Sequence, residues 1–189
     1  MPALPLILAS SSPRRRQLLE QHGYEFQVAP PHEAAECGIC SRETPPELVA
    51  RLAYQKAKDV AQRTLSGIVI GCDTVAECSG LILGKPKNRQ HAREMLSLLR
   101  GREHHVYSGL CLWRRPGEEH HVQVDVTKLV MDTITDEELD AYLSTDLWEG
   151  KAGAFGYQDG NDWVRVLSGS ESNVVGLPME LLARMLAEV

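Results

Sequence analysis

Three serines at positions 10–12 are followed by Pro13 and by three arginines at positions 14–16, a combination that could bind an anion. The apolar run 4–9 before them predicts a buried strand, and Ser12 can cap a helix that begins at Pro13. The first turn of a helix offers unpaired N–H groups and the positive end of the helix dipole, and arginines are unfavourable there unless an anion compensates them. These residues predict a phosphate site, with a solvated basic face as the alternative.

Asp73 is a carboxylate inside the apolar run 68–75, which itself predicts a buried strand. Aspartate is a poor strand former, and burying its charge is costly unless a cation, a metal ion or hydrogen-bond donors surround it. A site that holds phosphate and Mg²⁺ would supply this cation, because Mg²⁺ is bound by one or two carboxylates together with water and phosphate oxygens. The alternative is an aspartate that caps a following turn.

Lysines form a third group of candidates: Lys56 lies in a predicted helix, Lys85 precedes Pro86, and Lys151 opens a segment of small residues. Pro86 favours an extended backbone at Lys85, and the small residues after Lys151 would let the backbone approach a ligand. Taken singly, each lysine could be a solvated surface residue. Together with the serines, the arginines and Asp73, the lysines predict a pocket for a polyphosphate beside a metal-binding carboxylate.

The elements that position these residues follow from apolar periodicity, caps and turn residues. We expect strands at about 4–9, 68–75, 106–113, 121–131 and 163–167, and helices at about 13–21, 44–67, 88–101, 135–144 and 178–187. Helices and strands interleave without a strict βαβ order, which favours an α/β fold with a mixed sheet flanked by helices. The length of 189 residues predicts a single domain over 1–189, with room for two lobes.

Composition excludes several classes of protein. The chain is 43% hydrophobic and 24% charged, which is typical of a globular protein, and its net charge of -6 disfavours nucleic acid as a partner. No apolar run reaches the 18 or so residues of a membrane span, and the N-terminal apolar stretch is too short for a secretory signal. Five cysteines are an odd number and fit a reducing compartment. We expect a cytoplasmic protein that needs no membrane.

Cys37 and Cys40 form one Cys-x2-Cys pair, with His32 upstream. A structural zinc site would need a second pair of ligands at similar spacing. Cys72 and Cys78 lie in or beside a predicted strand, so we favour unligated thiols in a loop and keep a zinc site as the alternative.

Six blocks of sequence, in order along nearly the whole chain, carry a family resemblance. The blocks are Ala-Ser-Ser-Ser-Pro-Arg-Arg (9–15), Arg-Leu-Ala-x-x-Lys-Ala (51–57), Gly-x-Asp-Thr-Val (71–75), Gly-Lys-Pro (84–86), Lys-Ala-Gly-Ala-Phe-Gly-Tyr-Gln (151–158) and Val-Val-Gly-Leu-Pro (174–178). This pattern resembles the Maf family of nucleoside triphosphate pyrophosphatases. The resemblance implies a Maf/inosine-triphosphatase-like α/β fold with two lobes around a central cleft. It also implies metal-dependent hydrolysis of a nucleoside triphosphate to the monophosphate and pyrophosphate.

The resemblance also implies roles for single residues. Asp73 matches the proton acceptor and would bind the divalent metal ion, Mg²⁺ or Mn²⁺, together with an acidic residue from the loop after the first helix. That loop reads Pro-His-Glu-Ala-Ala-Glu-Cys and departs from the adjacent acidic pair usual in the family, so Glu36 is the match we prefer and Glu33 the alternative. The residues that would hold the phosphates are Ser10, Arg14, Arg15, Lys56, Lys85 and Lys151.

Three positions that differ between subfamilies predict the substrate. Arg14, Thr74 and Gln158 resemble the subfamily that acts on dTTP and UTP, whereas the 7-methyl-GTP subfamily has tryptophan at the first position. Donors and acceptors on Thr74 and Gln158 suit a pyrimidine edge. Two alternatives stay open: a pyrophosphatase for 7-methyl-GTP or another non-standard nucleotide, and a nucleotide-binding regulator of septum formation that does not hydrolyse its ligand. The resemblance also makes a homodimer plausible.

Overall fold

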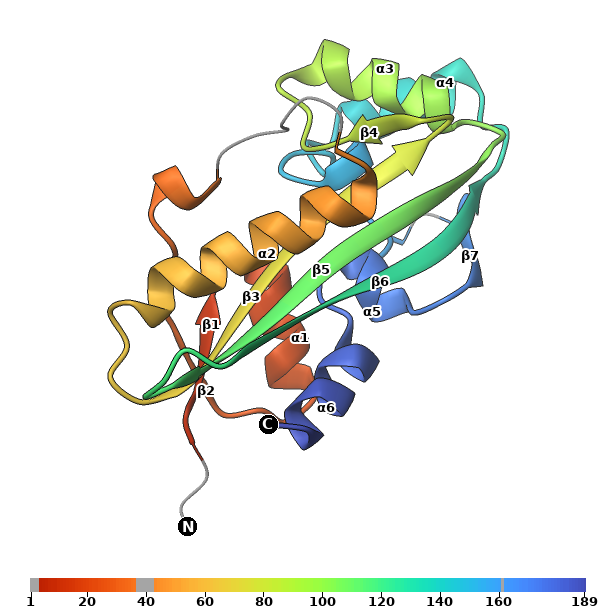
Figure 1. Ribbon diagram of the computed structural model, residues 1–189. Coiled ribbons are helices and arrows are strands. Elements are labelled where there is room, and N and C mark those ends of the chain that lie inside the picture. The colour runs from red at the N-terminus through yellow and green to blue at the C-terminus, as the bar shows by residue number, and fades with distance from the viewer. Residues whose placement is uncertain (1–3, 37–42, 161) are drawn as a thin grey trace. The chain divides into compact units, whose positions relative to one another are not determined.

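The computed structural model describes residues 4–36, 43–160 and 162–189 of the chain (Figure 1). The expectation for Cys37 and Cys40, whether thiols or zinc ligands, lies outside these residues. Within the described residues, no helix is both long and apolar enough to cross a membrane.

Seven strands of the described residues form one mixed sheet in the order β2-β1-β3-β5-β6-β7, with β4 paired to β3. β1 runs parallel to β2 and β3, whereas β4 and β7 are antiparallel to their neighbours. This confirms the mixed sheet of an α/β fold. The strands are β1 (Leu6–Ala9), β2 (Phe26–Val28), β3 (Gly67–Cys78), β4 (Leu81–Leu83), β5 (Glu103–Arg115), β6 (His120–Met131) and β7 (Val164–Ser168).

The helices interleave with these strands as expected. The N-terminal caps of two helices are those that the sequence predicts. The Thr44 N–H donates to Glu47 Oε2 over 2.9 Å, and Asn88 Oδ1 accepts the His91 N–H over 2.9 Å. The helices of the described residues are α1 (Pro13–Gln21), η1 (Glu33–Glu36), α2 (Pro45–Ala61), α3 (Arg89–Leu99), α4 (Asp136–Leu143), η2 (Ala152–Ala154), α5 (Glu171–Val175) and α6 (Met179–Ala187), of which η1 and η2 are short 3-10 helices.

The chain divides into two compact units, which agrees with the two lobes that the resemblance implies. The first contains Met1–Asp73, Ser108–Asp125 and Gly176–Val189, and the second contains Thr74–Tyr107 and Val126–Val175.

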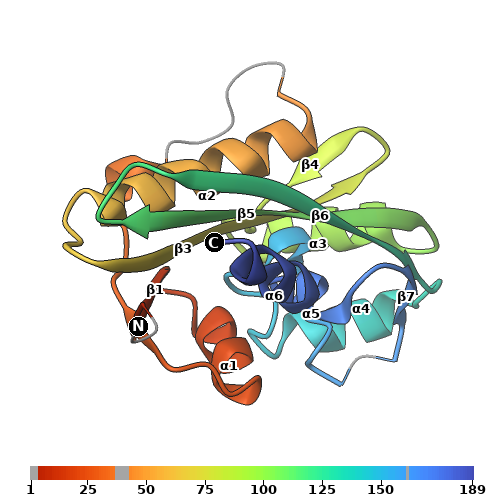
Figure 2. The ribbon, with the colours of Figure 1, turned by 60° about the horizontal axis from the view of Figure 1, so that its bottom comes forward.

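In the first unit, α2 covers one face of the sheet, and α1 and α6 lie on the other face (Figure 2). Its core joins small residues of α2, such as Ala53 and Ala57, to Val69 of β3. The helix approaches closely because Gly71 has no side chain. A Cβ atom there would lie 2.7 Å from Ala57 N and nearer still to the carbonyl oxygen of Ala53. Glycine at position 71 therefore sets the distance between α2 and β3.

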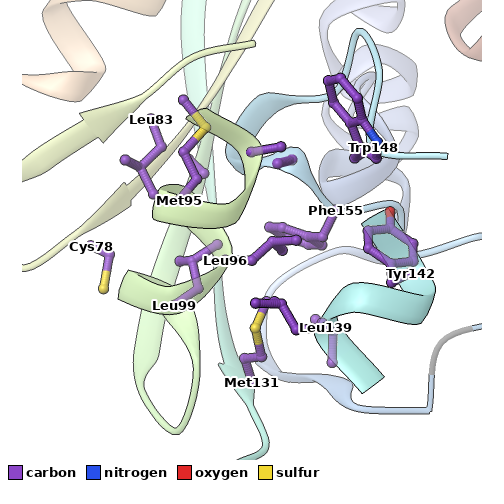
Figure 3. Packing of buried hydrophobic residues seen from close by; sticks show 14 of the residues in the cluster. Cys78, Leu83, Met95, Leu96, Leu99, Met131, Leu139, Tyr142, Trp148 and Phe155 are labelled. Carbon is purple, nitrogen blue, oxygen red and sulfur yellow. The ribbon is translucent and has the colours of Figure 1, made fainter. Parts of the chain in front are cut away.

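The second unit has a separate hydrophobic core. Met95, Leu96 and Leu99 of α3 point into it, and Leu139 of α4 and Phe155 close it from the other sides (Figure 3). Burying aliphatic and aromatic side chains of this size contributes about 1.5–3 kcal/mol each.

His104 is a buried polar group in this second unit, with only 1% of its surface exposed. Its ring meets Phe155 edge to face at 5.4 Å, and among the described residues its Nε2 has no hydrogen-bond partner. Burial lowers the pKa of His104 to about 4 because the apolar surroundings disfavour the charged ring, and this outweighs the hydrogen bond to the Arg102 carbonyl.

We therefore expect His104 to make the protein acid-sensitive. The unfolded chain takes up this proton below a pKa of about 6.5 and the folded protein only near 4, so the free energy of unfolding falls as the pH drops through this window. The loss from pH 7 to pH 4.5 should be about 2–3 kcal/mol larger in the wild type than in His104→Phe. Urea unfolding at both pH values measures it, and parallel losses in the two proteins would contradict the assignment.

The sequence prediction was wrong at the end of α2, which we placed near residue 67. The helix ends at Ala61, and the chain turns through Arg63 and Thr64. The Thr64 hydroxyl donates to the Val60 carbonyl over 2.8 Å and so satisfies a carbonyl at the helix end. The short strands β2 and β4 were not predicted.

Candidate active site

Ser10 and Arg15 form a buried hydrogen-bonded group where β1 leads into α1. Ser10 is 6% exposed and Arg15 is 9% exposed. Ser10 Oγ accepts the Ser12 N–H over 3.1 Å and Arg15 Nη1 over 3.2 Å, while Arg15 Nε donates to the Gly176 carbonyl over 2.8 Å. Ser12 is the N-cap residue of α1, although its own side chain makes no capping bond. The guanidinium of Arg15 is therefore held in one orientation at the start of α1.

The other two arginines of this turn lie in different surroundings. Arg16 is exposed and pairs with Glu20 over 2.8 Å, one helical turn further on, so it behaves as a solvated basic residue. Arg14 is half-buried. Successive helical residues point about 100° apart, which is why the three side chains separate in this way.

Lys56 and Asp73 form a buried ion pair. Lys56 Nζ lies 2.6 Å from Asp73 Oδ1, and the two side chains are 8% and 15% exposed. The pair joins α2 to β3. β3 continues past Asp73 to Cys78, so the alternative of an aspartate that caps a turn is wrong. Lys56 is thus the cation that compensates the buried carboxylate of Asp73. Asp73 keeps 15% of its side chain exposed, so solvent can still reach the carboxylate.

The backbone carbonyl of Gly176 links the Arg15 group to β3, the strand that also carries Asp73. Its carbonyl oxygen accepts both the Arg15 bond and a hydrogen bond from Cys72 Sγ, over 3.3 Å. Cys72 and Asp73 are neighbours in β3, and successive strand residues point to opposite faces. The Arg15 group therefore lies on one face of β3, and the ion pair of Asp73 lies on the face covered by α2.

The carboxyl end of β1 lies beside both groups. β1 ends at Ala9, which pairs with Gly71, so β3 extends beyond β1 from Cys72 to Cys78, and Asp73 lies just past the end of β1. Ligands of α/β proteins bind outside the carboxyl ends of parallel strands, where a following helix offers its N-terminal N–H groups. A phosphate chain at this end of β1 would meet the start of α1 and Asp73 together.

Two further candidates lie in the second unit. Lys151 pairs with Asp159, whose Oδ2 also accepts the Tyr142 hydroxyl over 3.3 Å. Lys151 is 11% exposed, so it is not the solvated surface lysine of the alternative interpretation. The Gly84 carbonyl accepts the Gly153 N–H over 3.1 Å. Lys85, which is exposed and follows Gly84 in the sequence, therefore lies near the segment that follows Lys151.

The remaining predicted residues differ in exposure. Thr74 is half-buried and Gln158 is exposed. Glu33 is exposed in η1, and the side chain of Glu36, in the last residue of η1, lies outside the described residues. No group of three or more His, Cys, Asp or Glu residues that could hold a metal ion occurs in the part of the chain that the structure describes.

His32 contacts Asp59 of α2 and not a metal-binding cluster. The His32 N–H donates to Asp59 Oδ2 over 3.0 Å, and His32 Nδ1 lies 2.8 Å from Asp59 Oδ1. Burial raises the pKa of Asp59, but the hydrogen bonds from His32 outweigh it and the pKa is lowered overall. This contact attaches the loop that carries Glu33 to α2.

Two residues of the site were missed by sequence reasoning. Asp159 follows the Lys151 block by one position, and nothing in its local sequence signals an ion pair with Lys151. Gly176 acts through its backbone carbonyl, which no side-chain pattern can reveal. Its block at 174–178 was noticed only through the family resemblance.

Several known proteins are similar to this chain in sequence or in fold. The model of the family described as "Maf-like protein" matches residues 5–189. A dTTP/UTP pyrophosphatase of Rhodopirellula baltica is 62% identical over 96% of this chain and 80% of its own length. Another, of Carboxydothermus hydrogenoformans, is 39% identical over 98% of both chains. The solved HAM1 protein of Coxiella burnetii shares the fold, with a TM-score of 0.54 at 16% identity over 98% of this chain and 100% of its own. The chain therefore belongs to the Maf family.

Proposed function

We propose that the protein is a metal-dependent nucleoside triphosphate pyrophosphatase that hydrolyses dTTP and UTP to the monophosphate and pyrophosphate. The observation that carries this proposal is the buried ion pair of Lys56 and Asp73 beside the carboxyl end of β1. Family relatives named dTTP/UTP pyrophosphatase support the same activity.

Asp73 acts as the general base. Its carboxylate accepts a proton from the water that attacks the α-phosphorus, and Lys56 keeps one carboxylate oxygen fixed so that the other faces the water. The bond between the α-phosphorus and the bridging oxygen breaks, and pyrophosphate leaves. The pair is preorganised because both side chains are nearly buried, so little reorganisation accompanies the reaction.

The phosphates bind at the start of α1. The Ser10 hydroxyl and Arg15 present donors there, and Arg15 holds its position through the Gly176 carbonyl. Positive groups aimed at the leaving pyrophosphate stabilise the charge that develops on it. From the family resemblance we also assign Arg14, Lys85 and Lys151 to phosphate binding.

A carboxylate such as that of Asp73 suits Mg²⁺ or Mn²⁺, since such ions are bound by one or two carboxylates and complete their shell with water and phosphate oxygens. Asp73 would hold the ion together with Glu36, or with Glu33 in its place. Once bound, the ion neutralises phosphate charge and polarises the phosphoryl oxygens. Asp73 would not bind the ion alone, because Lys56 already donates to one of the two carboxylate oxygens of Asp73.

Arg14, Thr74 and Gln158 select the base in this proposal. Thr74 follows Asp73 in β3, so its side chain points to the face of the strand opposite to the Asp73 carboxylate. Hydroxyl and amide groups discriminate strongly against bases that leave them unpaired. Among the described residues, Cys72, Cys78 and Cys111 form no disulfide, which is compatible with our assignment of the protein to the cytoplasm.

A panel of nucleoside triphosphates scored by pyrophosphate release tests this function. We expect dTTP and UTP to be hydrolysed with the highest kcat/KM in the presence of Mg²⁺ or Mn²⁺, and turnover to stop when EDTA removes the metal. A preference for 7-methyl-GTP or another modified nucleotide would contradict the substrate assignment. Tight binding of dTTP without metal-dependent turnover would favour the regulator of septum formation.

A further inference from the structure

Gln158 lies in a tight turn of the second unit. The Gly156 carbonyl accepts the Asp159 N–H over 3.2 Å, which closes a turn over residues 156–159 with Tyr157 and Gln158 as its two central residues. Gln158 is exposed, whereas the side chains of its two neighbours contact other segments of the unit. The amide of Gln158, which selects the base in the proposed function, is therefore presented at the tip of the turn.

Asp159 anchors one side of this turn. Its carboxylate pairs with Lys151, and its Oδ2 also accepts the Tyr142 hydroxyl over 3.3 Å. Tyr142 belongs to α4 and to the core of the second unit (Figure 3), and the side chains of Lys151 and Asp159 are only 11% and 13% exposed. A carboxylate with so little exposure keeps its partners, since an unpaired buried charge is costly. The position of Asp159 is therefore determined by groups outside the turn.

Gly156 and Tyr157 anchor the other side of the turn. A Cβ atom at Gly156 would overlap both Asp159 Oδ2 and Lys151 Nζ, so the ion pair packs directly against the backbone of the turn. The Tyr157 hydroxyl donates to Oε1 of Glu171, in α5, over 2.8 Å. The chain on both sides of Gln158 is thus attached to helices of the same unit.

We propose that Asp159 is a positioning residue that determines the base specificity of the reaction, because it holds the turn so that the amide of Gln158 meets the nucleobase in one orientation. This inference rests on the proposed function, in which Gln158 selects the base. An amide carries an acceptor on its oxygen and donors on its nitrogen, so it distinguishes two bases only when its direction is fixed. A turn without anchors would let the amide reverse and match either base, and binding would have to order it first.

Uracil and cytosine are the pair of bases that reports this orientation. Cytosine carries an amino donor where uracil, like thymine, carries a carbonyl acceptor, while UTP and CTP have the same sugar and triphosphate. Any effect of Asp159 on phosphate binding through Lys151 is therefore equal for the two nucleotides and cancels in the ratio of their kcat/KM values. The ratio for UTP over CTP isolates the orientation of Gln158.

A double-mutant cycle in the full chain tests the proposal. We expect Asp159→Ala to lower the UTP/CTP ratio of kcat/KM by about tenfold or more, since hydrogen bonds to a base can discriminate by still larger factors. Gln158→Ala should lower the ratio as well, and the double variant should lose no more than Gln158→Ala alone, because the effects of residues that act through one another do not add. Asp159→Asn should lower the ratio about fivefold, because it keeps an acceptor for Tyr142 but replaces the charge-assisted bond to Lys151 with a weaker neutral one.

Asp140→Ala is the matched control, because Asp140 pairs with Arg93 in the same unit and this ion pair does not involve residues 151–159. It should leave the ratio within about twofold of the wild type. The proposal is overturned by an unchanged ratio in Asp159→Ala, by a loss that Asp159→Ala causes equally with and without Gln158, or by a wild type that does not prefer UTP to CTP. If circular dichroism shows that Asp159→Ala is unfolded, Asp159→Asn decides by the same criteria.

Failure of the proposed function has a different signature. A wild type that binds UTP and CTP but hydrolyses neither would contradict the proposed function alone. The ratio of the two Kd values, from calorimetric titration of the same variants, would then test the role of Asp159 in the same way.

Discussion

Replacing Asp73 with asparagine is expected to lower kcat for dTTP hydrolysis by about three orders of magnitude, while nucleotide binding stays measurable. Asparagine keeps the shape of the side chain and an oxygen that can accept from Lys56, but it cannot take a proton from water. Loss of a positioned general base costs between about 10² and 10⁴ in rate. Steady-state kinetics gives kcat, and calorimetric titration with the nucleotide gives the affinity.

Asp132→Asn is the matched control for this substitution. Asp132 is also a carboxylate that pairs with a basic side chain, Arg165, over 2.8 Å, but it belongs to none of the groups of the proposed site and should leave kcat within about twofold of the wild type. Thermal unfolding of Asp73→Asn shows whether the loss is catalytic, because a folded variant with near-normal nucleotide affinity has lost chemistry alone. Near-normal turnover by Asp73→Asn would remove Asp73 from the role of base.

Gly71→Ala is expected to destabilise the protein by about 3 kcal/mol or more and to reduce activity as well. A Cβ atom at position 71 would collide with the backbone of α2 at Ala53 and Ala57, and backbone cannot move aside as a flexible side chain can. Overpacking of this kind usually costs 1–3 kcal/mol and more where the obstacle is rigid. For a chain of this length, that lowers Tm by about 6–12 °C. Displacement of α2 would also move Lys56 away from Asp73.

Gly84→Ala is the matched control for stability. A Cβ atom at Gly84 would meet no atom within 4 Å, so we expect a change in stability of no more than about 0.5 kcal/mol. Differential scanning calorimetry of both variants makes the comparison. A Tm for Gly71→Ala within about 2 °C of the wild type would show that α2 can yield and that the glycine does not set the separation of helix and sheet.

The sequence predicted the framework of the site because its signals are local. The serines before Pro13 and the buried run around Asp73 each identify a strand or a helix start from a few adjacent residues, and the structure places β1, α1 and β3 there. The need of Asp73 for a cation could also be inferred, since a buried carboxylate must be compensated. The sequence could not show that this cation is Lys56, because the contact between Lys56 and Asp73 depends on how α2 packs on β3.

What the sequence left open depends on contacts between distant segments. Arg15 was predicted to bind phosphate with Arg14, but that its guanidinium is oriented by Gly176, far along the chain, is visible only in the structure. The three-residue strands β2 and β4 were missed because so short a strand shows no alternation that periodicity can detect. The ion pair of Asp159 with Lys151 could not be predicted, because a single acidic residue in a loop is most often solvated.

The position of the bond that breaks is tested most directly by hydrolysis of dTTP in ¹⁸O-labelled water. Water activated by Asp73 attacks the α-phosphorus in our proposal, so the label should appear in dTMP, and pyrophosphate should be unlabelled by mass spectrometry. Label in pyrophosphate would show attack at the β-phosphorus and contradict the role that we propose for Asp73 at the α-phosphorus. Labelled orthophosphate released from the end of the chain would contradict the assignment of this site as a pyrophosphatase.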